Sequence, residues 1–329
     1  MTVASGIGSM PGKDAAAYDE AVQVILGETS DLPFLPELPG RGASADMVGR
    51  ALAVVSGLGA DLQPAGWRLT DAVGVDQRRA RSLLAQDLDS VEERTQGFAG
   101  RFKIQVAGPW TLAATVERPR GDRVLADHGA RRDLAQALAE GLREHIGDVR
   151  RRLPAATIVV QVDEPALPDV LDGRVPTASG FSRHRSVDAA GASPALEWVF
   201  SAIEESGATS VAHCCAGSLP LPLLTGAGAE GISVDLSLLE EAGYDDLAVA
   251  IEKGSTVLLG LVPSLEPEQW PTDQGPTDQV IRLLDMLGFD PSAAGEQLVI
   301  TPACGLAGAS ADWARQALAL SRKIAANLC

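Results

Sequence analysis

The sequence lacks the features that would place a protein in a membrane, on nucleic acid or in an oxidising compartment. None of its apolar runs reaches the roughly 18 residues needed to cross a bilayer, and no basic segment precedes an apolar one at the N-terminus. Basic residues are few, with 27 Lys and Arg against 44 Asp and Glu, so the net charge of -17 disfavours nucleic acid and anionic membranes as partners. Four cysteines, two of them adjacent, make no disulfide framework. We expect a soluble, cytoplasmic protein.

Short apolar runs alternate with helical patterns along the whole chain. Hydrophobic residues make up 46 % of the 329 residues, enough for a sizeable core. The run at 157–163 is almost continuously β-branched, as expected of a strand buried on both faces. Eight strand candidates result if the proline-rich segment is counted: 3–10, 31–39, 103–109, 157–163, 209–215, 231–236, 255–263 and 297–302.

This alternation predicts a parallel sheet, and eight units favour a (β/α)8 TIM barrel over an open doubly wound sheet. The open-sheet alternative needs a glycine-rich phosphate turn after the first strand, and Gly6-Ile-Gly-Ser-Met-Pro11 is not one. We therefore expect residues 1–329 to form a single barrel domain. The weak pattern at 66–70 suggests a minor additional strand.

Helix starts are less sharply marked than strands. We expect Asp14 and Ser44 to be N-caps, a long amphipathic helix to begin at Asp133, and two separate helices at 77–84 and 88–98. The Gly-, Ser- and Arg-rich stretch 172–192 contains Arg174, Arg183, His184 and Arg185. A connection of this length is typical of a lid or a mobile insertion, although a solvated loop is the simpler interpretation.

Two apolar runs end in soft metal ligands. His213 and Cys215 are two residues apart, so on a strand both side chains point to one face and Cys214 points to the other. Together with the distant Cys304 they could form a three-ligand zinc site with a fourth position for a carboxylate, water or substrate. The alternative is structural, since buried cysteines often serve only as small apolar residues.

Acidic and polar residues also follow the strand candidates, at the end where barrels carry their active sites. Asp163 ends the most buried run, so its carboxylate must be paired, hydrogen-bonded or placed in a polar mouth. Asp235 ends 232–235 in the same way and is a candidate fourth zinc ligand, or the partner that orients His213. Ser9 and Glu37 occupy similar positions, and for all of them a purely structural rim role is the competing interpretation.

Six segments together resemble the catalytic C-terminal barrel of cobalamin-independent methionine synthases. They are Ile7-Gly-Ser-Met-Pro11, Val106-Ala-Gly-Pro-Trp-Thr111, Gln161-Val-Asp-Glu-Pro-Ala-Leu167, His213-Cys-Cys215, Ile232-Ser-Val-Asp235 and Pro302-Ala-Cys-Gly305. Their order matches the family's I-G-S-x-P, G-P-x-T, D-E-P-A-L, H-x-C and C-G-L signatures over nearly the whole chain. The barrel type is shared with uroporphyrinogen decarboxylase-like methyltransferases.

The resemblance implies a zinc-dependent methyltransferase that makes methionine from homocysteine. It assigns zinc to His213, Cys215, Cys304 and, in place of the family's Glu, Asp235. It assigns the amino-acid part of homocysteine to Ser9 and Asp163, and we take Asp163 as a catalytic residue as well. Asp169 stands where a residue contacting methyl-folate is expected. Thiolate-bound zinc could take the homocysteine sulfur as a further ligand and keep it deprotonated.

The sequence also departs from the family pattern. Family members typically have two barrels, the acid that usually follows Asp46-Met-Val48 is Gly49, and 260–264 lacks the family's His. Two alternatives follow. The methyl group could come from a methylated corrinoid protein, with homocysteine or another thiol as acceptor. Alternatively, the protein could bind zinc or an amino acid without catalysing a reaction.

Overall fold

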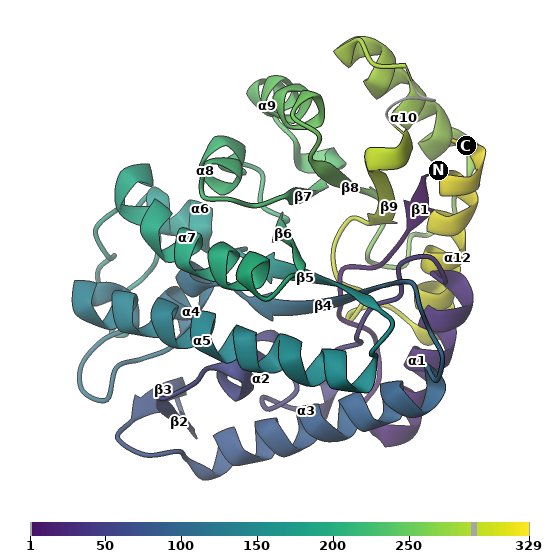
Figure 1. Cartoon of the computed structure of the whole chain (residues 1–329). Helices are drawn as coiled ribbons and strands as arrows, with labels where there is room; N and C mark the ends of the chain where they lie inside the picture. The colour runs from purple at the N-terminus through teal and green to yellow at the C-terminus, as the bar shows by residue number, and fades with distance from the viewer. Residues whose placement is uncertain (1, 291–294, 329) are drawn as a thin grey trace.

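A parallel sheet of seven strands curls around the centre of the molecule (Figure 1). The computed structural model describes residues 2–290 and 295–328. The strand order in the sheet is β1-β9-β8-β7-β6-β5-β4, and every neighbouring pair is parallel. The strands are β1 (Val3–Ala4), β4 (Arg101–Ala107), β5 (Thr157–Asp163), β6 (Thr209–Cys214), β7 (Gly231–Asp235), β8 (Thr256–Val262) and β9 (Leu298–Pro302).

The proline-rich segment 33–37 fills the gap between the two edge strands. On one side, the Lys103 amide of β4 donates to the Pro33 carbonyl over 2.8 Å, and the Leu35 amide donates back to the Lys103 carbonyl over 2.9 Å. On the other side, the Glu37 amide donates to the Gly8 carbonyl over 3.0 Å. Prolines lack the donors of a regular ladder, so the pairing is sparse. It nevertheless closes the ring, and the predicted (β/α)8 barrel is confirmed.

Helices cover the outside of the barrel (Figure 1). They are α1 (Ala15–Glu28), α2 (Met47–Val54), α3 (Val75–Arg94), α4 (Pro109–Thr115), α5 (His128–Arg152), α6 (Leu167–Leu171), α7 (Ala189–Glu205), α8 (Leu221–Gly226), α9 (Glu241–Glu252), α10 (Gln274–Leu287) and α12 (Ala311–Asn327). Short 3-10 turns occur at Pro39–Arg41, Val124–Ala126, Leu236–Leu238 and Gly295–Gln297. The minor strand at 66–70 is confirmed, as β3 (Gly66–Thr70) in a hairpin with β2 (Gly59–Gln63).

Several predicted helix limits were wrong. Asp14 does cap α1, but α2 is capped by Asp46 rather than Ser44, because the Asp46 carboxylate accepts the Gly49 amide over 2.7 Å. The two helices expected at 77–84 and 88–98 are the single helix α3, and α5 begins five residues before Asp133, behind the N-cap Asp127. None of the described helices is long and apolar enough to span a bilayer.

The barrel interior changes from apolar to polar along β5 and β6. One small apolar cluster holds Val159 of β5 and Val211 of β6 with Leu32, Leu258 and Val299. Side chains two residues apart on a strand share a face, so Gln161 and Asp163 follow Val159 on β5, and His213 follows Val211 on β6. Polar groups therefore collect at the carboxyl ends of the strands, the mouth of the barrel.

Two helical glycines should respond oppositely to the same substitution. A Cβ at Gly49 of α2 would lie 1.9 Å from the Ala43 carbonyl oxygen, whereas a Cβ at Gly27 of α1 would meet nothing within 4 Å. We expect Gly49→Ala to destabilise the fold by about 1–3 kcal/mol through the forced backbone shift. Gly27→Ala should stabilise it by about 0.5–1 kcal/mol. Urea denaturation of both variants tests this, and shifts of the same sign would contradict it.

Candidate metal centre and adjoining cavity

The structure brings His213, Cys215 and Cys304 together at the mouth of the barrel. His213 lies on β6, Cys215 follows the last residue of that strand, and Cys304 lies two residues beyond β9. One potential ligand atom from each of the three lies within 4.8 Å of the others. Cys214 is buried and is not part of this group. The two-residue spacing on β6 and the end of β9 thus place two thiols and an imidazole around one point.

Ser233 orients the imidazole. His213 and Ser233 are partners in the register of β6 and β7, and His213 Nδ1 lies 2.9 Å from Ser233 Oγ. This contact leaves Nε2 of the ring for a metal ion or a substrate. Sequence reasoning missed Ser233, although a serine in the middle of an apolar barrel strand was a signal that its hydroxyl faces a polar partner.

Asp235 does not lie in the metal-ligand group. Its Oδ1 accepts hydrogen bonds from the Ser237 amide over 2.9 Å and the Ser237 hydroxyl over 2.6 Å. It lines a separate cavity together with Gly260 and Ala303. The predicted orienting role toward His213 is held by Ser233 instead, and nothing in this arrangement supports Asp235 as the fourth ligand.

The two thiols of the group share one hydrogen bond. Cys215 Sγ and Cys304 Sγ lie 3.1 Å apart. This bond, assisted by His213, lowers the pKa of Cys304 below its ordinary value, whereas the same bond and burial raise the pKa of Cys215. Two thiols and an imidazole form a donor set that suits Zn²⁺, which prefers sulfur and nitrogen ligands. The residues present therefore fit a zinc ion.

A cavity of about 300 Å³ opens beside the thiols. Its lining residues come from the ends of strands, from the segments that follow strands and from α2: Ile7, Gly8, Ser9, Glu37, Pro39, Met47, Gln105, Asp163, Pro165, His213, Cys215, Cys304 and Gly305. A Cβ at Gly305 would lie 2.0 Å from Ser9 Oγ, so only glycine lets the Cys304 loop pack over Ser9. The Leu306 amide also donates to the Ser9 carbonyl over 2.8 Å. Ser9 and Asp163 therefore share one cavity with the metal-ligand group.

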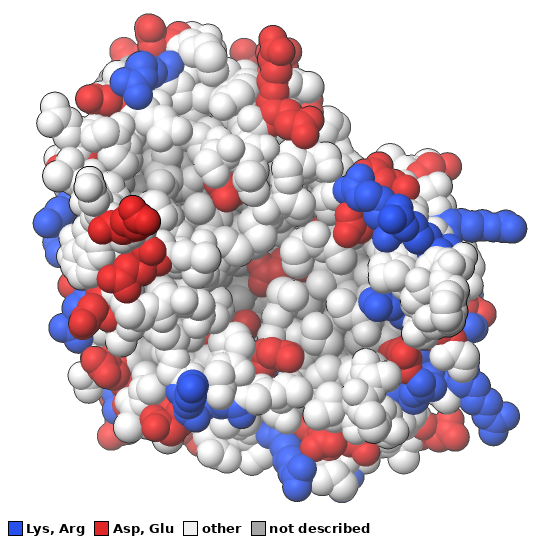
Figure 2. Space-filling view, turned by 180° about the vertical axis from the view of Figure 1, so that it is seen from behind, with Lys and Arg blue, Asp and Glu red and all other residues white. Residues whose placement is uncertain are grey.

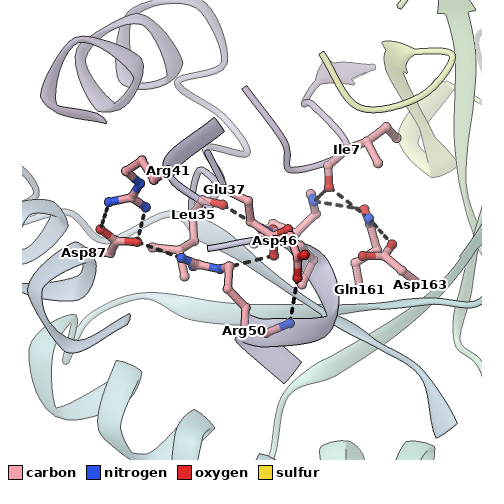
Figure 3. A network of polar contacts seen from close by, with 12 residues as sticks. Ile7, Leu35, Glu37, Arg41, Asp46, Arg50, Asp87, Gln161 and Asp163 are labelled. Atoms are coloured by element: carbon pink, nitrogen blue, oxygen red, sulfur yellow. Dashed lines mark hydrogen bonds and ion pairs between the residues drawn. The ribbon is translucent and has the colours of Figure 1, made fainter. Parts of the chain in front are cut away.

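Asp163 is held by hydrogen bonds from inside the barrel (Figure 3). Its Oδ1 accepts from Gln161 Nε2 over 2.7 Å, and Lys103 Nζ in turn donates to Gln161 Oε1 over 2.9 Å and to the Ile7 carbonyl over 2.8 Å. Burial raises the pKa of Asp163 to about 7 and lowers the pKa of Lys103 to about 8. The side-chain amide of Gln161 thus bridges the Asp163 carboxylate and the Lys103 ammonium group.

A second buried network fixes Glu37 at the cavity wall (Figure 3). Arg50 of α2 pairs with Glu37 through Nε over 3.3 Å and with Asp87 through Nη1 over 2.7 Å. Arg41 binds the same Asp87 with two hydrogen bonds of 2.8 and 2.7 Å. Burial raises the pKa of Glu37, and the charge of Arg50 opposes that rise. The network holds the Glu37 carboxylate in one position.

Glu164 and residues 108–111 support the site without being among the residues that line the cavity. Glu164 Oε1 accepts the Trp110 amide over 2.9 Å, and Oε2 accepts the Thr111 amide over 2.7 Å, so Glu164 holds the first turn of α4. A Cβ at Gly108 would lie 2.4 Å from Glu164 Oε1, which explains the glycine. These contacts tie the end of β5, and with it Asp163, to the loop after β4.

Asp169 lies outside the cavity. Its side chain is 54 % exposed and pairs with Arg174 over 2.8 Å on the loop that follows α6. That loop is tied to the 119–123 turn, because the Ala178 amide donates to Asp122 over 2.9 Å and His184 Nε2 lies 3.2 Å from Asp122. The role as a lid that the sequence suggests for residues 172–192 stays a prediction.

Charged side chains are unevenly spread over the face seen from behind (Figure 2). This face is hollowed near its centre, and acidic side chains occur in and around the hollow, whereas most Lys and Arg side chains lie toward the periphery. On this face, no broad basic area is seen among the described residues.

The chain is similar to known methionine synthase domains in both sequence and fold. Residues 103–327 match the family model described as cobalamin-independent synthase, catalytic domain. A B12-independent methionine synthase from Shewanella sp. W3-18-1, solved in complex with selenomethionine, shares the fold with a TM-score of 0.64 at 15 % identity, covering 100 % of this chain and 98 % of that one. A β-galactosidase from Marinomonas ef1 has a TM-score of only 0.47 at 11 % identity, covering 99 % of this chain and 59 % of that one. No curated protein gave a match.

Proposed function

Because the chain belongs to the family of cobalamin-independent synthase catalytic domains, we propose that it is a zinc-dependent homocysteine S-methyltransferase that produces methionine. The observation that supports this most directly is the group of His213, Cys215 and Cys304 beside a cavity that holds Ser9 and Asp163. A thiol substrate in that cavity would have its sulfur next to the two cysteine ligands and its polar end near the carboxylates. We propose that residues 1–329 act as one zinc-binding domain.

In this proposal His213, Cys215 and Cys304 hold the ion. Zinc bound there would lower the pKa of a substrate thiol and keep its sulfur nucleophilic at neutral pH. Ser233 keeps the His213 ring in the orientation that binds. Asp163, held by Gln161, accepts hydrogen bonds from the amino group of the substrate, and Ser9 donates to its carboxylate.

We propose a methyl-folate as the methyl donor, in line with the family. The donor would approach the mouth from the side of α6 and its loop, where Asp169 stays a predicted contact. None of the described residues specifically favours a methylated corrinoid protein. Because the paired thiols must stay reduced to bind an ion, we place the protein in a reducing compartment such as the cytoplasm.

Zinc content and zinc-edge X-ray absorption of the purified protein test the proposal. We expect near-stoichiometric zinc and, after addition of L-homocysteine, a new zinc–sulfur contact at about 2.3 Å that L-norleucine does not produce. Methyl transfer from methyl-tetrahydrofolate should follow. A protein without zinc, or one whose zinc never meets homocysteine, would exclude thiol activation. If the protein binds zinc and homocysteine but shows no turnover with methyl-folate or methylcobalamin, the result would support the alternative of a non-catalytic binding protein.

A further inference from the structure

The loop after α6 folds into a small hairpin with a fully exposed aromatic tip. We call residues 175–184 the hairpin, and at its base the His184 amide donates to the Val175 carbonyl over 2.9 Å. Val175 is buried, whereas Phe181 at the tip is 97 % exposed. Among the described large apolar side chains, the next most exposed is only 62 % exposed. Phe181 therefore makes almost no contact with the rest of the chain in this conformation.

Positive charge lies beside this tip. Arg183 and Arg185 are exposed, and neither forms an ion pair with a described residue. The acids Asp169 and Asp172 are not available to them, because both pair with Arg174. In a chain with a net charge of -17, unpaired guanidinium groups next to an exposed aromatic ring favour a counterpart that is acidic and partly apolar.

A segment with this chemistry follows β7. Residues 236–246 include Leu238, which is 44 % exposed, and the exposed acids Glu240, Glu241 and Asp245. None of these three acids forms an ion pair with a described residue. A leucine beside carboxylates complements a phenylalanine beside guanidinium groups. Both surfaces follow the carboxyl ends of barrel strands, so they belong to the same rim of the mouth.

The hairpin is long enough to reach that segment. The strands β5 and β7 are both neighbours of β6, so their ends lie about 10 Å apart (Figure 1). An extended arm such as 176–180 spans about 17 Å. A hairpin that crossed from β5 toward β7 would pass over residues 215–220, the loop after β6 that begins with Cys215.

In the conformation of this structure, Asp122 holds the hairpin on the opposite side. Its Oδ1 accepts the Ala178 amide over 2.9 Å and lies 3.2 Å from His184 Nε2. Asp122 belongs to the turn 119–123, which lies in the connection after β4. Gly173, whose φ is +64°, supplies a conformationally free residue just before the hairpin. The hairpin is thus attached toward β4 while the chemistry of its tip matches the rim after β7.

We propose that the hairpin is a lid with two positions, one latched to Asp122 and one docked on residues 236–246, and that the second position closes the mouth over the metal-ligand group. In the docked position the aromatic tip covers the apolar part of the segment, and the two unpaired arginines face its acids. Closure separates the cavity from solvent, so a methyl donor must enter while the hairpin is latched. This meaning for catalysis rests on the proposed function, whereas the two positions do not.

A photo-reactive amino acid at the tip reports the docked position. With p-benzoylphenylalanine in place of Phe181, we expect irradiation to give a cross-link within one chain to residues 236–246, mapped by mass spectrometry of peptides. Asp122→Ala removes the latch and should raise the cross-link yield by at least about 3-fold, as expected for the loss of two hydrogen bonds. Asp133→Ala is the matched control, because it removes an exposed acid that pairs with Arg132 on α5, and it should leave the yield unchanged.

Exchanging the charges tests the docking itself. Arg183→Glu combined with Arg185→Glu should lower the yield by about 10-fold, because two attractions become repulsions. Adding Glu240→Arg and Glu241→Arg to that variant should restore the yield. A cross-link between two chains, a cross-link to residues outside 236–246, no cross-link, or a yield that does not respond to the charges would overturn the lid.

The outcome is separable from that of the proposed function, because the cross-link requires neither zinc nor homocysteine. A mapped cross-link in a protein that binds no zinc would keep the lid and remove thiol activation. A zinc–sulfur contact from homocysteine in a protein whose hairpin never reaches residues 236–246 would do the reverse.

Discussion

Cys304→Ala should abolish methyl transfer, whereas Cys214→Ala should leave it within a few-fold of the wild type. Cys304 belongs to the metal-ligand group, and Cys214 is buried outside it although it adjoins Cys215 in the chain. Removing groups that merely orient a metal ligand typically costs 10- to 100-fold, so loss of a direct ligand should lower the rate by more than about 100-fold. The loss should be accompanied by loss of bound zinc.

The measurement pairs steady-state methyl transfer with zinc content for both variants, and circular dichroism serves to check that each is folded. The two substitutions are chemically identical, so a general sensitivity of the barrel to cysteine loss would affect both. Retained zinc and activity in Cys304→Ala would exclude Cys304 as a ligand. Loss of zinc in Cys214→Ala alone would mean that the strand presents the other thiol to the metal.

Asp87→Asn should destabilise the protein by about 3–5 kcal/mol, because it leaves two buried guanidinium groups without their shared partner. Asp87 is 2 % exposed and accepts hydrogen bonds from both Arg41 and Arg50. Substitution by Asn removes the charge and keeps the volume, so a cavity cannot explain the loss.

Asp89 provides the control on the same helix. Its side chain is 66 % exposed and pairs with Arg152, so Asp89→Asn should change stability by less than about 1 kcal/mol. The free energies of unfolding from urea titrations decide the comparison. Similar values for the two variants would show that the buried network contributes no more than a surface ion pair.

The architecture was predictable because its signals repeat. The continuous β-branched run 157–163 marks a strand buried on both faces, and eight strand candidates in alternation with helices leave few topologies. Helix starts were harder to place because several residues can cap. Ser44 and Asp46 are both good N-caps, and only the three-dimensional path shows that the Asp46 carboxylate reaches the Gly49 amide. The helix α3 contains no Gly or Pro, so the break predicted within it had no physical basis.

The parts of the candidate site that follow from the two-residue period of a strand could be predicted from the sequence. The parts that depend on contacts between neighbouring strands could not. The spacing of His213 and Cys215 places both on one face of β6, and the structure brings Cys304 to them. Ser233 and Gln105 depend on register and on packing against Gly8, which the sequence does not display. Asp235 follows the same pattern as Asp163, yet its carboxylate closes a local turn on Ser237, a competing use that strand position alone cannot exclude.

The proline-rich segment 33–37 has a consequence for how the chain avoids aggregation. Until it docks, β1 and β4 are open edges of a strongly apolar parallel sheet, and such edges pair readily with other chains. A regular eighth strand would also close the barrel, but in the partly folded chain, before it docks, such a strand could pair with a second molecule. Pro33 and Pro36 lack the donors for such a ladder, so this segment can cover the two edges of its own barrel while being a poor template for another.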